Sequence, residues 1–487
     1  MLFCYTKNMA NQGKYITKKS ENLSDWYNDV IIAAKLAEHG PVRGTMIIRP
    51  YGYAIWEAIQ KNLDTRIKDL GAENAYFPMF IPYSFLEREK DHVEGFSPEL
   101  AVVTHAGGEK LPEPLVVRPT SETIIYDAFS RWIQSYRDLP LTVNQWSNVV
   151  RWEKRPYLFL RTTEFLWQEG HSAHKSNEES QELVEQALKM YVETYQDDLA
   201  LFGYAGRKSE SEKFAGAVAT YSYEMLMPDG KALQGCTSHN LGQNFSKVFN
   251  VKYQTEKGQE DLVWQNSWGF TTRSIGGLIM AHGDDNGLIL PPGVAPIQVK
   301  IIPIVTKNSD NKEIEALAQK AFAVLEGRDI RVRIDNSDAS PGWKFNQADL
   351  EGVSLRVEIG ATEAKEGKVR VVRRDNKESF LLNPQELGDQ VDEILAKMQS
   401  DLLERSKKFT LENTREARTY PDFKEIMNTT KGFIKAFWCE DPHCEEMIKE
   451  ETKASTRCLP LGSEPSEGVC IYCQKPAKFQ WLFAQSY

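Results

Sequence analysis

The chain has 487 residues, of which 41% are hydrophobic and 26% are charged. At roughly 100–200 residues per domain, this length corresponds to two to four domains, and the composition excludes a disordered or fibrous chain. The 59 basic and 69 acidic residues give a formal net charge of -10, which argues against indiscriminate binding to nucleic acid but allows a local basic face.

No apolar run in the sequence approaches the ~18 residues that a membrane-spanning helix requires. The N-terminal segment also lacks the apolar core of a secretory signal. We therefore expect a cytoplasmic protein that makes no contact with a membrane.

The first part of the chain, 1–293, combines helical and strand patterns. Ser176-Asn177-Glu178-Glu179 is typical of a capping box, and apolar residues at helical spacing follow it, so an amphipathic helix is predicted there. Short β-rich segments surround this helix, which favours an α+β domain with a mixed or antiparallel sheet over a repeated β-α-β series. The expected strands cover 75–82, 115–117, 148–152 and 288–290.

Pro291-Pro292-Gly293 interrupts this pattern, and a small α/β domain is predicted over 294–400. A long charged helix is expected from Asn383 to about Lys408, and it leads into a C-terminal domain at 401–487. The strands expected in the α/β domain cover 299–305, 330–334, 354–359 and 368–372, and a helix at 313–326 lies between the first two.

The seven cysteines are unevenly distributed, because five of them lie in the C-terminal domain. Cys439 and Cys444 form one close pair, and Cys470 and Cys473 form another. Four thiolates in two close pairs suit a structural zinc ion, which predicts a small α/β zinc-binding domain. Disulfides are the alternative, and a cytoplasmic location disfavours them. Cys458 lies outside this spacing and is expected to be a free thiol.

Arg118-Pro119-Thr120-Ser121-Glu122 follows a short apolar segment. If a strand continues through it, Thr120 and Glu122 point to the same face. A hydroxyl and a carboxylate side by side suit a ligand with a cationic amine, because both oxygens can accept its protons. Alternatively, a helix begins here and these polar side chains cap it.

Val149-Val150-Arg151-Trp152-Glu153 predicts a second strand, with Arg151 and Glu153 on one face. Arg161 follows after Arg155-Pro156-Tyr157, which suits a hairpin turn. Two arginines on facing strands would bind phosphate oxygens through planar, bidentate donors. Solvated salt bridges between the strands are the alternative.

A third arginine, Arg273, belongs to Gly269-Phe270-Thr271-Thr272-Arg273-Ser274-Ile275-Gly276-Gly277 and precedes an apolar segment at 278–281. Near the start of a helix, this arginine and the free backbone N–H groups would form another anion site. A purely structural arginine is the alternative.

Together, these three segments resemble the signature motifs of class II aminoacyl-tRNA synthetases, and the chain is most similar to prolyl-tRNA synthetases of the archaeal and eukaryote-like type. Gly71-Ala72-Glu73-Asn74-Ala75-Tyr76-Phe77-Pro78 resembles motif 1, the segment 150–165 resembles motif 2, and Thr272-Arg273 resembles the end of motif 3 without its glycine-rich lead-in. The likeness continues through Trp167-Gln168-Glu169-Gly170-His171, Gln234-Gly235-Cys236-Thr237-Ser238-His239, Pro341-Gly342-Trp343-Lys344-Phe345 and Tyr487.

The resemblance implies an enzyme that forms prolyl-adenylate and pyrophosphate from L-proline and ATP, and then transfers the prolyl group to the terminal adenosine ribose of tRNA(Pro). Arg151 and Arg273 are the implied catalytic residues, because positioning and charge stabilisation dominate such chemistry. The implied proline-binding residues are Thr120, Glu122, Arg151, Trp167, Glu169, His171, Phe214 and His239. The implied ATP-binding residues are Arg151, Glu153, Arg161, Thr162, Gln234, Thr237, Thr271 and Arg273.

The resemblance also implies cofactors and partners. ATP is used with Mg²⁺, which Gln234 helps to place, and the four paired cysteines hold a structural Zn²⁺. Motif 1 implies a homodimer, because the family has this segment at the dimer interface. The family also places the terminal carboxylate, at Tyr487, close to the active site. In the domain at 294–400, which resembles an anticodon-binding domain, the candidates for base contacts are Lys344, Arg356 and Glu358.

Some relatives carry an editing domain between motifs 2 and 3. The stretch between Phe165 and Arg273 is too short for this insertion, so we expect no editing in cis. A sister class II synthetase for another amino acid is one alternative function, and Thr120 with Glu122 argues against it. A catalytically inactive, RNA-binding relative is another, and the complete set of ATP-site residues argues against that.

Overall fold

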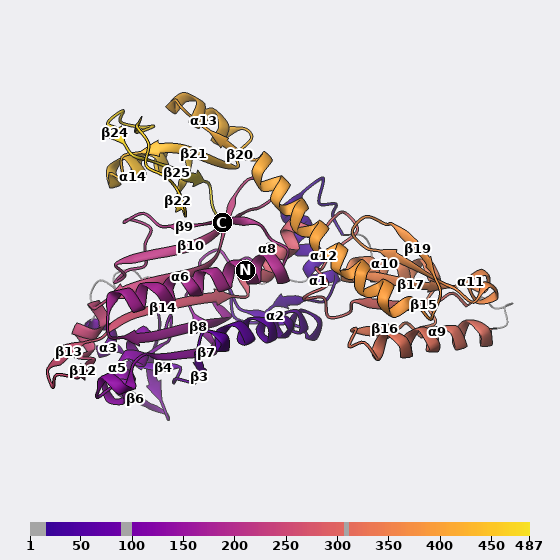
Figure 1. Cartoon of the computed structure of the whole chain (residues 1–487), viewed down its shortest axis with the longest axis horizontal. Coiled ribbons are helices and arrows are strands. Elements are labelled where there is room, and N and C mark those ends of the chain that lie inside the picture. Colours follow the sequence, from indigo (N-terminus) through magenta and orange to yellow (C-terminus); the bar gives the residue numbers. More distant parts are fainter. Residues whose placement is uncertain (1–15, 89–99, 306–310) are drawn as a thin grey trace.

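The computed structural model describes residues 16–88, 100–305 and 311–487, and its main feature is one large sheet (Figure 1). This sheet has eleven strands. Neighbouring strands are antiparallel except at the two ends, where β3 with β7 and β20 with β21 are parallel. In spatial order the strands are β20 (Thr414–Glu416), β21 (Phe433–Trp438), β25 (Phe479–Ala484), β22 (Ser455–Pro460), β9 (Gly203–Arg207), β10 (Ala219–Leu226), β11 (Ala232–Gly242), β14 (Trp264–Thr271), β8 (Glu164–His174), β7 (Leu141–Val150) and β3 (Glu73–Asn74).

Helix α6 (Asn177–Glu193) covers one face of the central strands. The Ser176 side chain caps it by accepting the N–H of Glu179 at 3.3 Å, so the predicted helix start is confirmed. Val184 and Tyr191 are fully buried on its apolar side, and the Tyr191 ring stacks on Phe270 of β14 with 5.8 Å between ring centres. Because this face of the sheet is filled, a pocket has to lie on the opposite face.

Other elements complete the first part of the chain. Its further helices are α1 (Leu23–Ala33), α2 (Pro50–Asp69), α3 (Tyr83–Arg88), α5 (Glu122–Trp132), α7 (Asn244–Phe249) and α8 (Arg273–His282), with short turns at η3 (Tyr136–Asp138) and η4 (Thr194–Asp198). Small sheets are formed by β1 (Ala37–His39) with β2 (Met46–Ile48), by β4 (Phe80–Pro82) with β6 (Glu109–Val117) and β5 (Ala101–Ala106), and by β12 (Lys252–Gln254) with β13 (Glu260–Leu262).

The four strands expected in this part have different outcomes. The expected strand at 115–117 lies within β6, and the one at 148–152 ends early, at Val150 in β7. The strand at 75–82 is replaced by β3 and β4, with an irregular run between them. Residues 288–290 are buried but form no strand, so that prediction is wrong. A short apolar run indicates burial, but it does not distinguish a strand from a buried loop.

The second sheet has five strands and confirms the predicted α/β domain. β15 lies between β16 and β17 and is parallel to both, whereas β18 is antiparallel to both of its neighbours, β17 and β19. The strands are β16 (Val332–Ile334), β15 (Val299–Pro303), β17 (Leu355–Ile359), β18 (Val369–Arg373) and β19 (Ser379–Leu382), and the helices are α9 (Asn311–Glu326), α10 (Pro341–Glu351) and α11 (Ala361–Glu366).

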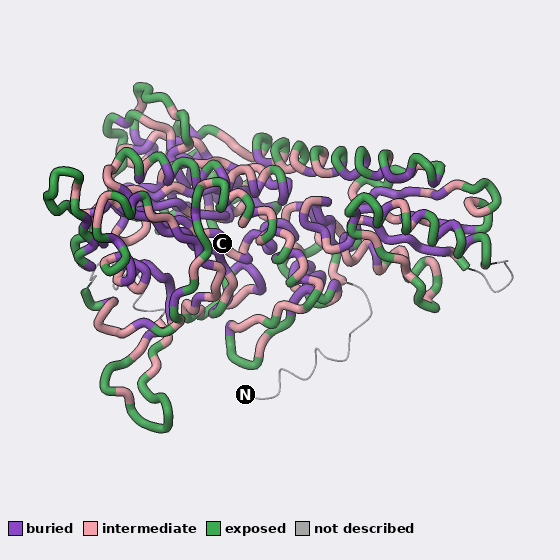
Figure 2. Tube along the Cα trace, turned by 60° about the horizontal axis from the view of Figure 1, so that its bottom comes forward, coloured by how far each residue is buried: buried purple, intermediate pink, exposed green. Residues whose placement is uncertain are grey.

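The long helix α12 (Leu387–Glu412) runs from the second sheet to the C-terminal part, and its outer side is exposed along most of its length (Figures 1 and 2). The C-terminal part also holds α13 (Tyr420–Asn428), α14 (Pro442–Thr452) and a small hairpin of β23 (Gly468–Val469) and β24 (Pro476–Ala477).

Apart from the hairpin of β23 and β24, the strands of the C-terminal part do not form a separate sheet. β22 pairs with β9 through Leu459 and Pro460, so β20, β21, β25 and β22 extend the sheet of the first part. The backbone N–H of Tyr487 donates to the carbonyl of Ala232 at 3.2 Å, which fixes this segment beside the start of β11. Within the described parts of the chain, no helix is both long enough and apolar enough to cross a membrane.

Candidate active site

The uncovered face of the central strands forms the floor of a pocket of about 640 Å³. Residues two apart along a strand point to the same face, so Trp167, Glu169 and His171 of β8 all line it. Strand register places Ser267 of β14 between His171 and His239 of β11. Every predicted proline-binding and ATP-binding residue lines this one pocket.

Thr120 and Glu122 lie side by side at the start of a helix. Helix α5 begins at Glu122 with Ser121 at its N-cap position, so no strand continues through this segment and the alternative helix start is confirmed. The Ser121 side chain, however, makes no capping hydrogen bond. The Thr120 hydroxyl donates to one carboxylate oxygen of Glu122, and the Ser267 hydroxyl donates to the other at 3.2 Å. Both side chains are buried, and the helix N-terminus favours the negative charge of the carboxylate.

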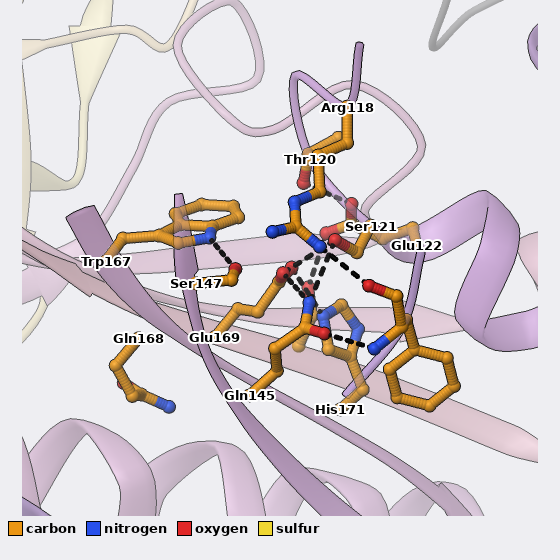
Figure 3. Close-up of polar contacts among 12 residues, drawn as sticks. Arg118, Thr120, Ser121, Glu122, Gln145, Ser147, Trp167, Gln168, Glu169 and His171 are labelled. Atoms are coloured by element: carbon orange, nitrogen blue, oxygen red, sulfur yellow. Dashed lines mark hydrogen bonds and ion pairs between the residues drawn. The ribbon is translucent and has the colours of Figure 1, made fainter. Parts of the chain in front are cut away.

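A second buried carboxylate, Glu169, is held by a network of polar contacts (Figure 3). Its Oε1 accepts the Ser121 hydroxyl at 2.6 Å and the Gln145 amide at 2.8 Å. Its Oε2 lies 3.0 Å from Nε2 of His171, whose Nδ1 lies 3.3 Å from the Tyr126 hydroxyl. These contacts fix Glu169 and His171, so this wall of the pocket is rigid.

Arg151 lies directly after the last residue of β7 and therefore outside the strand in which it was expected. Its Nε donates to the carbonyl of Pro119 at 3.0 Å, which ties it to the segment that precedes Thr120. Its guanidinium carbon lies 5.6 Å from the ring centres of both Phe165 and Trp167. Cation–π attraction to the two rings holds Arg151 beside the acidic end of the pocket.

Positive charge gathers at the other end of the pocket. Arg273 is the first residue of α8, as predicted, and its Nε donates to the carbonyl of Leu160 at 3.1 Å. Arg161 pairs with Glu153, with 3.6 Å between Nε and Oε2. Burial, with the nearby charges of Arg151 and Arg161, lowers the pKa of Arg273 to about 10. Arg273 therefore remains protonated at neutral pH, and this end suits phosphate groups.

The turn between Arg151 and Arg161 differs in position from the one predicted. Tyr157 pairs with Arg161, and the turn comprises 158–160, whereas 155–156 is an irregular approach to it. The turn residues are apolar and almost fully buried, and the Tyr27 hydroxyl donates to the carbonyl of Leu158 at 2.8 Å. The turn contains none of the glycine, proline or asparagine residues that usually mark a turn, and burial of its apolar side chains stabilises it.

Phe214 and His239 close the pocket near its acidic end. Their ring centres lie 4.6 Å apart, with the rings inclined by 32°. The Thr220 hydroxyl oxygen accepts the backbone N–H of Phe214 at 3.0 Å and lies 2.9 Å from Nδ1 of His239. Burial lowers the pKa of His239 to about 4, so its ring is neutral at physiological pH. This side is therefore an uncharged wall that does not repel a cationic ligand.

The remaining predicted residues lie in strands or close to them. Gln234 and Thr237 belong to β11, Thr271 ends β14, and Thr162 follows the turn at 158–160. Cys236 lies among them, and burial raises the pKa of its thiol well above the usual range. Its sulfur therefore stays protonated, and it is no candidate for a nucleophile.

Sequence reasoning missed several residues of the site. Ser267 faces Glu122 only because of strand register, and a lone serine in a strand carries no local signal. Ser121 and Gln145 reach Glu169 from separate elements. Lys208 and Glu212 line the pocket from the connection between β9 and β10, where charged residues are usually solvated.

The four predicted metal ligands come together near β21 and α14. The Sγ atoms of Cys439, Cys444, Cys470 and Cys473 all lie within 4.8 Å of one another. Cys439 Sγ is 3.7 Å from the sulfurs of both Cys444 and Cys473. Zinc–sulfur bonds of ≈ 2.3 Å in a tetrahedron place sulfurs about 3.8 Å apart, so the cluster fits a metal ion of this kind. Cys458 lies in β22, apart from the cluster.

Family models of known proteins match three successive parts of the chain. Three family models match: "tRNA synthetase class II core domain (G, H, P, S and T)" at 108–282, "Anticodon binding domain" at 298–394 and "Prolyl-tRNA synthetase, C-terminal" at 420–487. These matches fall within the three predicted domains, 1–293, 294–400 and 401–487, whose bounds themselves stay a prediction.

Similar proteins cover nearly the full length of the chain. A proline--tRNA ligase from Chlorobaculum tepidum is 51% identical over 97% of this chain and 99% of its own, and one from Borreliella burgdorferi is 49% identical over the same shares. A solved structure of prolyl-tRNA synthetase from Cryptosporidium parvum, in complex with halofuginone and AMPPNP, is 44% identical with a TM-score of 0.92 and covers 97% of this chain and 99% of that chain.

The sheet, with its acidic and cationic pocket, and the matched core model define an ATP-using class II aminoacyl-tRNA synthetase. Within that class, the sequence identity to proline--tRNA ligases over nearly the full length of the chain identifies the family. The chain belongs to the prolyl-tRNA synthetase family.

Proposed function

We propose that the protein attaches L-proline to tRNA(Pro), with prolyl-adenylate and pyrophosphate formed from proline and ATP in the first step. One observation carries this proposal: the carboxylates of Glu122 and Glu169 line the same pocket as Arg151, Arg161 and Arg273. The acidic end suits the cationic amine of an amino acid, and the cationic end suits the phosphates of ATP.

Proline differs from other amino acids in carrying a secondary ammonium on an apolar ring. Thr120 and Glu122 would accept its two N–H groups. Contacts with an apolar ring discriminate weakly, since one methylene is worth only about 1–3 kcal/mol. Smaller amino acids would therefore be rejected incompletely. The ring would be enclosed by Trp167, Glu169, His171, Phe214 and His239.

Adenylate formation needs the two ends of the pocket to act together. Arg151 would bind the proline carboxylate and the α-phosphate, and would stabilise negative charge while a carboxylate oxygen attacks phosphorus and pyrophosphate leaves. Arg273 would hold the γ-phosphate of a bent ATP. Mg²⁺, placed with the help of Gln234, would neutralise charge on the phosphates. The nucleotide would also contact Glu153, Arg161, Thr162, Thr237 and Thr271.

The second step transfers the prolyl group from the adenylate to a ribose hydroxyl of the terminal adenosine of the tRNA, and AMP leaves. All residues between Phe165 and Arg273 are described, and they form the strands and helices of the catalytic part itself. No separate editing domain occurs in this stretch. A mischarged tRNA would therefore not be hydrolysed in cis.

The α/β domain would read the anticodon through Lys344 of α10 and through Arg356 and Glu358 of β17. Lys344 Nζ donates to the carbonyl of Asp335 at 2.9 Å, and Arg356 Nε donates to Glu358 at 3.1 Å. These contacts place the charged groups in fixed positions. Trp343 beside them is 53% exposed and offers a ring on which an unstacked base can lie.

The four clustered cysteines would hold a structural Zn²⁺, which four thiolates leave without an open position. Thiolate ligation suits a reducing compartment, and we place the enzyme in the cytoplasm with tRNA(Pro) as its partner. We further propose that it acts as a homodimer through the motif 1 segment, in which Tyr76 is 72% exposed.

Proline-dependent exchange of labelled pyrophosphate into ATP tests the proposed function. Wild-type protein should exchange with proline, and Glu122→Gln should raise the KM for proline about 100-fold, because a hydrogen bond to a charged partner is worth about 1.5–3 kcal/mol. The KM for ATP should stay unchanged, and Glu256→Gln, at an exposed site, serves as the control. Absence of proline-dependent exchange would exclude the proposal, and stronger exchange with another amino acid would reassign the substrate.

A further inference from the structure

Residues 208–217, which make up nearly all of the connection between β9 and β10, form one side of the proline pocket. It carries Phe214 at the wall beside His239, and Lys208 and Glu212 also line the pocket. The connection consists of turns and irregular backbone. Its position therefore depends on what holds it from outside.

A carboxylate of the C-terminal part holds the beginning of this connection. The Ser209 hydroxyl donates to Oε1 of Glu445 in α14 at 2.9 Å, and the Thr456 hydroxyl donates to the same oxygen. Ser209 Oγ also accepts the backbone N–H of Glu212 at 3.3 Å. Ser209, Glu445 and Thr456 are all buried. Glu445 thus fixes the residue from which the first turn of the connection starts.

A buried ion network holds the same region from β22. Arg457 donates through Nε and a terminal nitrogen to Oε2 of Glu224, at 2.9 and 2.7 Å. The other oxygen of Glu224 accepts the Ser222 hydroxyl at 2.7 Å and lies 3.4 Å from Nζ of Lys208. Lys208, Glu224 and Arg457 are 3%, 0% and 5% exposed, so water screens their mutual attraction very little.

The backbone brings these groups together at close range. α14 and β22 lie next to β9 and β10, as Figure 1 shows. At Gly206 of β9, a Cβ atom would come within 2.4 Å of the carbonyl oxygen of Leu459. Only glycine allows this close approach, so the backbones of β22 and β9 are packed directly against each other.

We propose that Arg457 and Glu445 of the C-terminal part are positioning residues for the proline pocket: they hold segment 208–217, and with it Phe214, in the position that binds the amino acid. Neither residue lines the pocket, so each acts through Lys208 or Ser209. The inference rests on the proposed function and gives the C-terminal part a role in amino-acid affinity.

Proline-dependent pyrophosphate exchange by the full-length, zinc-loaded protein tests this inference, with KM determined separately for proline and ATP. Arg457→Met and Glu445→Gln should each raise the KM for proline roughly tenfold, because each removes a buried, charge-assisted hydrogen bond. The KM for ATP and the kcat should stay within about twofold, since the contacts on the ATP side remain. Arg457→Lys, which keeps the charge, should restore part of the affinity.

Matched controls are available in the same part of the chain. Arg418→Met and Glu446→Gln make the same changes at exposed positions and should leave both KM values unaltered. Ser209→Ala removes only the hydroxyl held by Glu445, and it should raise the KM for proline about threefold and add nothing in combination with Glu445→Gln. Glu445→Gln and Ser209→Ala test the proposed positioning role even if Arg457→Met does not fold.

Two results would overturn the inference while leaving the proposed function intact. The first is a KM for proline within twofold of wild type in folded Glu445→Gln and Ser209→Ala proteins. The second is an equal rise of both KM values, which would indicate a general disturbance of the site. Loss of proline-dependent exchange in the wild-type protein would instead refute the proposed function itself.

Discussion

Arg118 and Arg151 lie close together in the fold but have different roles: Arg118 is buried, and Arg151 is half-buried. Arg118 is 1% exposed, and its guanidinium donates to the carbonyls of Asn148 and Phe77 at 2.7 and 2.8 Å and to Oδ1 of Asn148 at 3.0 Å. Arg151 lines the pocket between two aromatic rings. The first therefore joins loops to the sheet, and the second lines the pocket.

Substitution of the two arginines should separate these roles. Arg151→Ala should abolish pyrophosphate exchange and leave the circular dichroism spectrum unchanged, because the proposed contact with the α-phosphate is lost. Arg118→Met should lower the melting temperature, since each carbonyl left without a donor costs about 1–3 kcal/mol. An unfolded Arg151→Ala protein would show that Arg151 is structural instead.

Buried histidines make stability depend on pH. Burial lowers the pKa of His282 to about 3, and its Nε2 lies 2.9 Å from the carbonyl oxygen of Leu199. Between that value and about 6.5, the pKa in an unfolded chain, only the unfolded protein binds the proton. Stability is therefore highest above pH 6.5 and falls as the pH drops towards 3.

His282→Gln should make this dependence shallower, because glutamine can donate the same hydrogen bond and does not titrate. Urea unfolding between pH 7 and 4.5 measures the change, which amounts to about 1.4 kcal/mol per pH unit for one proton. His39→Gln at an exposed site is the control. An unchanged slope in His282→Gln would mean that the folded protein protonates His282 readily.

At the scale of elements, metal removal tests the cysteine cluster. Freshly purified, reduced protein should contain one zinc per chain, and Cys470→Ser should lose it and unfold α14 and the hairpin of β23 with β24. Thiolate ligation of structural zinc supplies folding free energy directly. Metal analysis and thermal unfolding measure both effects, with Cys458→Ala as the control. Full zinc content in Cys470→Ser would exclude the four-thiolate site.

The sequence predicts some elements well and others poorly, for physical reasons. Helix α6 is predictable because its cap and its apolar spacing are both local. The start of α5 at Glu122 is not fixed by the local sequence, since capping residues and strand residues share the pattern of 120–122. The turn at 158–160 is held by burial and not by turn residues, so nothing in the local sequence marks it.

Some residues of the candidate site can likewise be predicted from the sequence and others cannot. The family resemblance alone implies Trp167, Glu169 and His171, because strand β8, which places them on one face, is not among the strands expected from the sequence. Ser267 and Gln145 reach the site through register between strands that are distant in the chain. Local patterns carry no information about such pairing.

At the scale of the whole molecule, the proposed homodimer is testable through Tyr76. Tyr76 is 72% exposed in the motif 1 segment, and Phe80 and Trp132 are also exposed, at 44% and 49%. Tyr76→Asp should shift the protein to monomer in light scattering and reduce exchange, because a buried charge without a partner opposes association. Leu411→Asp, on exposed α12, is the control. A wild-type monomer would contradict the homodimer itself.

The continuous sheet has a consequence for the synthesis of the chain. The ribosome delivers β9 and β10 well before β22, with the second sheet and α12 made in between. During that time the edge of β9 has no partner strand, and Glu224 lacks Arg457. Exposed strand edges favour aggregation, and synthesis proceeds at about 5–20 residues per second. The nascent catalytic part therefore spends roughly 10–50 s in need of protection, and fragments that end before β22 should depend on chaperones to stay in solution.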